Sequence, residues 1–69
     1  MTKTVETNLR LGVTVGTYML DIWTSNIKRD EPEYCVSLRM ARKRRQELLQ
    51  AGYGVALFRV TATGLDWVR

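Results

Sequence analysis

The chain has no histidine and a single cysteine, Cys35, among its 69 residues. Without an imidazole, neither a Cys-His nucleophile nor a Ser-His-Asp triad can be assembled, although serine-lysine and carboxylate-only chemistry stay formally open. One cysteine excludes an intramolecular disulfide and leaves too few ligands for a structural metal cluster. The sequence therefore predicts a protein that is not an enzyme and that holds no metal or other cofactor.

Long hydrophobic runs are also absent from the sequence. The first twenty residues, MTKTVETNLRLGVTVGTYML, lack the uninterrupted apolar stretch of a signal peptide or a membrane span. A lone cysteine suits a reducing compartment. These features predict a cytoplasmic protein, or a cytoplasmic or nuclear one in a cell with a nucleus. They also predict that the protein has no membrane partner.

The composition is that of an ordinary globular domain, with 45% hydrophobic and 26% charged residues. A chain of 69 residues is too short for a second core, so we expect a single compact domain over residues 1–69. The formal net charge of +4 favours contact with polyanions or with acidic protein surfaces.

Apolar and polar residues alternate over residues 5–15 and again over 18–23, which is typical of strands with one buried face. A small glycine-threonine pair separates the two segments, so we expect a β-hairpin that turns at Gly16. Residues 53–62 are β-branched and aromatic enough for another strand. Residues 65–69 form either a last short strand or a loose tail.

Residues 38–51 consist mainly of strong helix formers, and Gly52 supplies a C-terminal stop. Ser37 is the favoured N-cap, whereas the alternative start is a capping box made by Asp30 and Glu33. The predicted fold class is α+β. It has a small antiparallel β-sheet of three or four strands, in the order β-β-α-β, with one helix packed across one face.

A helical wheel of residues 38–51 places one apolar arc toward the sheet. The arc contains Leu38, Ala41, Leu48 and Leu49. Arg45 falls near the middle of the same arc, where an unpaired guanidinium would be costly to bury. Its side chain must extend to water, pair with a carboxylate such as Asp21 or Glu6, or show that the wheel is misphased.

Four cations of this helix can reach a partner, namely Arg39, Arg42, Lys43 and Arg44. They are spread around the helix, so the pattern fits either a polyanion-binding surface or the solvated side of a helix. The planar guanidinium of arginine favours bidentate contact with phosphate or carboxylate. Both interpretations stay open at the level of sequence.

Met19 and Trp23 alternate with Tyr18, Leu20 and Ile22, so they fall on the sheet face away from the helix. One helix cannot cover both faces of a sheet, which makes these two residues, with Leu57 beside them, candidates for a protein interface. In the alternative, the C-terminal segment LDWVR folds over this face and buries it.

Two functions compete on these grounds. The first is docking of nucleic acid or a nucleoprotein complex through the basic helix by phosphate neutralisation, since no helix-turn-helix, zinc-finger or RNA-recognition signature is present. The alternative is an inhibitor or adaptor, of the size often encoded by phages and plasmids, that covers a surface of a host protein. A homodimer formed through open sheet edges is compatible with both.

Overall fold

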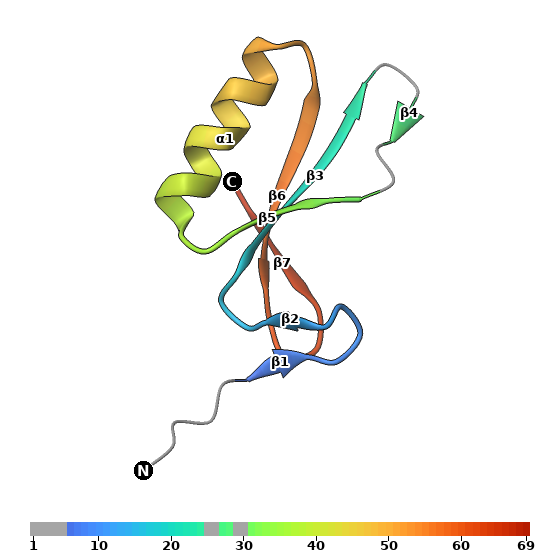
Figure 1. The fold of residues 1–69 in the computed structure, drawn as a ribbon, viewed down its shortest axis with the longest axis vertical. Helices are drawn as coiled ribbons and strands as arrows, with labels where there is room; N and C mark the ends of the chain where they lie inside the picture. The colour runs from blue at the N-terminus through green and yellow to red at the C-terminus, as the bar shows by residue number, and fades with distance from the viewer. Residues whose placement is uncertain (1–5, 25–26, 29–30) are drawn as a thin grey trace.

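The computed structural model describes residues 6–24, 27–28 and 31–69 (Figure 1). In chain order its elements are β1 (Thr7–Asn8), β2 (Val13–Thr14), β3 (Tyr18–Thr24), β4 (Ile27–Lys28), β5 (Glu33–Cys35), α1 (Leu38–Gln50), β6 (Gly54–Val60) and β7 (Leu65–Val68). Among these residues, no helix has the length and apolar character that a membrane crossing requires.

β3 is the central strand of an antiparallel sheet. Tyr18 pairs with Arg59 of β6 and also with Cys35 of β5, so β5 and β6 lie on opposite edges of β3. β4 follows β5 along the same edge, since Trp23 pairs with Lys28 on one side and with β6 on the other. β7 pairs with β6 and lies at the other end of the sheet.

α1 connects β5 to β6, which run parallel to each other with β3 between them. The helix packs on one face of the sheet, against β3, β5 and β6 (Figure 1). The predicted α+β class, with one helix on an antiparallel sheet, is confirmed, and the sheet has more strands than the sequence predicted. The C-terminal segment is a true strand, β7.

The helix begins and ends at the local signals found in the sequence. The Ser37 hydroxyl accepts a hydrogen bond from the backbone amide of Met40 at 3.2 Å, which satisfies one amide of the first turn. Gly52 has a φ of 95°, a left-handed conformation that glycine adopts without strain. The alternative start at the Asp30-Glu33 box is wrong because Glu33 belongs to β5, and Asp30 lies outside the described residues.

The core lies between α1 and the face of the sheet that the helix covers. It consists of Leu20, Ile22, Ala41, Leu48 and Leu57, with Tyr18, Cys35, Leu38, Tyr53, Val55 and Val68 packed around them. The predicted apolar arc is confirmed except at Leu49, whose side chain is 47% exposed. On the helical wheel Leu49 lies across the buried arc from Arg44, the residue that contacts β5.

The predicted hairpin between residues 5–15 and 18–23 is wrong in its pairing. β1 pairs with β2 instead, and the two form a separate small sheet. The chain turns between β1 and β2. The turn is stabilised by the Asn8 side-chain oxygen, which accepts hydrogen bonds from the amides of Arg10 and Leu11, and by Gly12, which has a φ of 66°. Val5 lies outside the described residues.

Candidate functional site

The four predicted cations of α1 divide into two groups. Arg39, Arg42 and Lys43 are exposed. Arg44 is held by Glu33 of β5: its Nε donates to Oε1 at 2.8 Å and its Nη2 donates to Oε2 at 3.0 Å. These bonds to a carboxylate raise the pKa of the Arg44 guanidinium. Arg44 therefore ties the helix to β5 and is not free to bind a partner.

The two groups lie on different sides of the helix. Successive residues of an α-helix are about 100° apart, so Arg44 and Arg42 lie on opposite flanks of the arc that faces the sheet. Since Arg44 contacts β5, Arg42 is turned toward the β6 and β7 side. Arg39 lies one turn before Arg42 on the same flank, and Lys43 lies next to them on the outer side.

The acidic residues near the helix are gathered on the flank that faces β5. Glu33 binds Arg44, and Glu47 lies 3.9 Å from the same guanidinium. Within the described part of the chain, no carboxylate forms an ion pair with Arg39, Arg42 or Lys43. These three exposed residues, the cationic flank, form no ion pair within the described residues, and Lys43 stands at its border with the acidic side, where it lines a groove with Glu33 and Glu47.

Arg45 and Arg59 do not extend the cationic flank. Arg45 is partly exposed, and no buried polar side-chain atom of the described residues lacks a partner, so its guanidinium is not buried unpaired in the core. Arg59 is exposed on β6, but it lies directly opposite Asp66 of β7 in the antiparallel register, where opposite charges attract.

A groove of about 330 Å³ separates β5 from the helix. It is lined by Glu33, Cys35, Met40, Lys43, Arg44 and Glu47. Burial, with a smaller contribution from the Glu33 carboxylate, raises the pKa of the Cys35 thiol, and Arg44 opposes the increase. The thiol is therefore protonated at neutral pH and is a poor nucleophile. No group of three potential metal ligands occurs in the described ranges.

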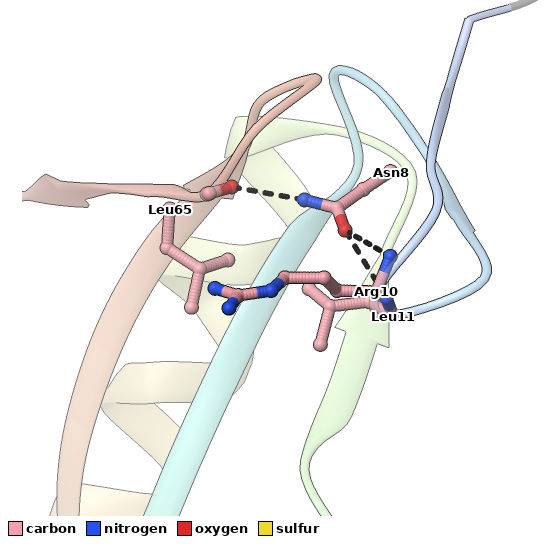
Figure 2. Close-up of a pocket in the computed structure, with 5 residues that line it drawn as sticks. Asn8, Arg10, Leu11 and Leu65 are labelled. Carbon is pink, nitrogen blue, oxygen red and sulfur yellow. Dashed lines mark hydrogen bonds between the residues drawn. The ribbon is translucent and has the colours of Figure 1, made fainter.

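A second cavity, of about 280 Å³, lies at the far end of the molecule, between the β1–β2 connection and the β6–β7 turn (Figure 2). Its apolar walls are Leu11 and Leu65, and the Arg10 side chain extends toward Leu65. Asn8 holds the cavity together, because its Nδ2 donates to the carbonyls of Thr61 at 2.8 Å and Gly64 at 3.3 Å. The cavity therefore forms where the Asn8 side chain links the β1–β2 connection to the β6–β7 turn.

Met19 and Trp23 lie on the sheet face away from the helix, as their alternation predicts. Met19 is only 8% exposed and cannot serve as an anchor for a partner, whereas Trp23 is 38% exposed. Leu57 was expected beside them but lies on the other face, buried opposite Leu20. The C-terminal segment does not fold over this face; as β7 it widens the sheet.

The register adds large residues to this face that the sequence pattern missed. Tyr34 and Phe58 lie on either side of Met19, and Trp67 lies beside Phe58. The sequence signal for Phe58 was its alternation with Leu57 and Arg59, but its alignment with the other residues follows only from strand pairing.

No family model matches the chain, and no curated protein or solved structure matches it either.

Proposed function

We propose that the chain is a small non-catalytic binding module that docks nucleic acid through the cationic flank, Arg39, Arg42 and Lys43. The observation that supports the proposal is the separation of charge around α1. Arg44 is paired with Glu33 and Glu47 on the flank toward β5, while the three exposed cations form no ion pair in the described residues. Such a surface attracts polyanions by releasing their counterions.

The spacing of the three cations suits a phosphate backbone. Arg39 is three residues from Arg42 and four from Lys43, so the three side chains are neighbours on the helix surface. The two arginines can each donate two parallel hydrogen bonds to a phosphate, and the lysine supplies a point charge. Contacts of this kind fix position without reading sequence. The single free cysteine fits a cytoplasmic site of action.

The test is the salt dependence of binding to labelled mixed-sequence DNA and RNA, measured by fluorescence anisotropy. Three phosphate contacts predict a slope of log K against log salt of about −2 to −3. Changing all three cations to alanine should weaken binding by roughly tenfold per cation near 0.1 M salt. Arg10→Ala, which removes a charge at the far end of the molecule, is the control and should change affinity little.

Two results would refute the proposal. One is the absence of binding at low salt. The other is a triple variant that binds as well as the Arg10→Ala protein, since that would show that the three cations of the flank together contribute no more than one distant charge. Binding to an acidic protein but to no nucleic acid would assign the same cationic flank to the alternative partner and would equally reject nucleic acid as the ligand.

A further inference from the structure

The sheet face away from the helix carries a row of large side chains that crosses the whole sheet. In register order the row is Tyr34 of β5, Met19 of β3, Phe58 of β6 and Trp67 of β7. Its two ends are open to water, with Tyr34 42% and Trp67 65% exposed. Met19 fills the middle as a buried support. The row therefore has an exposed aromatic ring at each end.

Trp23 adds a third exposed aromatic ring further along β3. Its cross-strand partner is Gly54, and a Cβ atom placed at Gly54 would collide with the indole. The indole thus lies over the backbone of β6 at Gly54, in the space that the side chain of any larger residue at position 54 would occupy. The sheet supports the ring from below, and its outer side stays accessible to a partner.

A positive charge accompanies the most exposed ring of the face. The guanidinium carbon of Arg69 lies 5.5 Å from the centre of the Trp67 ring, which is within the range of a cation–π contact. This arrangement is suited to a nucleotide, because a base can replace the guanidinium on the indole face and the displaced guanidinium can then meet the phosphate. A purely aliphatic partner would gain nothing from the Arg69 charge.

The dimensions of the row fit a short length of unpaired nucleic acid. Neighbouring strands are about 4.8 Å apart, so Tyr34 and Trp67, three strand spacings apart, are separated by about 14 Å. Bases splayed onto separate rings are farther apart than the roughly 3.4 Å between bases stacked on one another, so this distance corresponds to at most about four nucleotides. The bases of a duplex are already stacked within it and cannot reach these rings, whereas the bases of a single strand can.

We propose that this face, the aromatic face, binds single-stranded nucleic acid, with bases stacked on Trp67, Tyr34 and Trp23 and with Arg69 near the backbone. The inference goes beyond phosphate docking by the cationic flank, because it concerns the opposite side of the molecule and adds a preference for unpaired bases. It does not depend on Arg39, Arg42 or Lys43, so the two proposals can succeed or fail separately.

The experiment measures the affinity of the full chain for deoxythymidine oligonucleotides of increasing length and for a duplex of matched composition. We expect tighter binding to the single strands, with a marked gain up to about four nucleotides. Trp67→Ala should weaken single-strand binding by about 5- to 150-fold, the loss typical of one stacking ring, and should leave duplex binding unchanged. Trp67→Phe keeps a ring and should retain most of the affinity.

Matched controls separate stacking from folding and from general charge. Leu9→Ala removes an exposed apolar side chain from the β1–β2 connection and should have no effect on either ligand. Circular dichroism should show a folded Trp67→Ala protein, because the side chain is largely exposed. The triple variant of the cationic flank should weaken duplex and single-strand binding together if both proposals hold.

Three results would overturn the aromatic face as a single-strand site. The first is equal or tighter binding to the duplex, and the second is unchanged single-strand affinity in Trp67→Ala. The third is a dimer, detected by sedimentation velocity, that Trp67→Ala dissociates without any preference for single strands. In that case a second copy of the chain covers the face. If the cationic-flank variant has no effect but Trp67→Ala does, only the phosphate-docking proposal fails.

Discussion

The guanidinium of Arg44 on α1 forms two hydrogen bonds with the carboxylate of Glu33 on β5. The pair joins the helix to β5, the edge strand that precedes it in the chain. It places the Arg44 flank of the helix against the acidic side chain of Glu33. Bidentate bonds between charged groups are among the stronger polar contacts in proteins. Both side chains are partly exposed, however, so solvent screens the attraction and limits what it contributes to stability.

Glu33→Gln should therefore release Arg44 at a small cost in stability. We expect the thermal midpoint to fall by no more than about 5 °C. The released guanidinium would extend the cationic flank around the helix, so affinity for nucleic acid should rise by up to about tenfold near 0.1 M salt. Glu31→Gln makes the same change of charge at an exposed position before β5 and is the control. An equal increase in both variants would show that only net charge had changed.

The reactivity of the Cys35 thiol depends on the Glu33–Arg44 pair. Burial and the Glu33 carboxylate raise the pKa of its thiol, so alkylation by iodoacetamide should be slow at pH 7 and should accelerate at a higher pH than for an unfolded thiol. Because the folded state favours the protonated thiol, its contribution to stability is present below the unfolded pKa and is lost as the pH rises through the folded pKa.

The rate of Cys35 alkylation should also respond to Glu33→Gln. This substitution removes a charge that raises the pKa and keeps Arg44, which lowers it, so the pH profile should move to lower pH. The chain denatured in guanidinium gives the reference profile. A folded protein that reacts at the denatured rate at every pH would contradict the assignment of burial as the main cause.

The elements that were predicted well depend on neighbours in sequence. The N-cap of α1 at Ser37 and its end at Gly52 follow from residues within one turn of each terminus. The alternation in β3 likewise separates Leu20 from Met19 without knowledge of the partner strands. The α+β class could be predicted because these local signals alternate between strand and helix along the chain.

The features that the sequence did not reveal depend on distant contacts. The predicted N-terminal hairpin failed because the Asn8 side chain bonds to Thr61 and Gly64, which are 53 and 56 residues away. The removal of Arg44 from the candidate site required knowing which flank of α1 meets β5. The position of Trp67 beside Phe58 depends on the register between β6 and β7, which composition does not determine.

Gly54 is required by Trp23 and not by its own backbone conformation. Gly54→Ala places a methyl group where the indole lies, so the ring must move off β6. We expect a loss of about 1–3 kcal/mol in the free energy of unfolding, together with a change in tryptophan fluorescence. Gly64→Ala meets open space and should change stability by less than about 0.5 kcal/mol. Equal midpoints for the two variants in urea denaturation would show that the indole is not confined by Gly54.

Asn8 is 1% exposed and is the polar residue that joins β1 to the β6–β7 turn. Its amide donates to the carbonyls of Thr61 and Gly64. Its oxygen accepts from the amides of Arg10 and Leu11 (Figure 2). Asn8→Ala removes these bonds, although the Gly64 carbonyl keeps its bond from the Thr61 amide, and a buried polar group that loses its hydrogen bond typically costs about 1–3 kcal/mol.

The effect of Asn8→Ala on hydrogen exchange should be confined to the residues around Asn8. Hydrogen exchange in Asn8→Ala should accelerate at the amides of Arg10 and Leu11, while the core amides of β3 keep their protection relative to global stability. Thr63→Ala, an exposed change in the β6–β7 turn, should leave both the denaturation midpoint and these exchange rates near those of the parent chain. If Asn8→Ala behaves like Thr63→Ala, the small N-terminal sheet is held in place by contacts other than the Asn8 side chain.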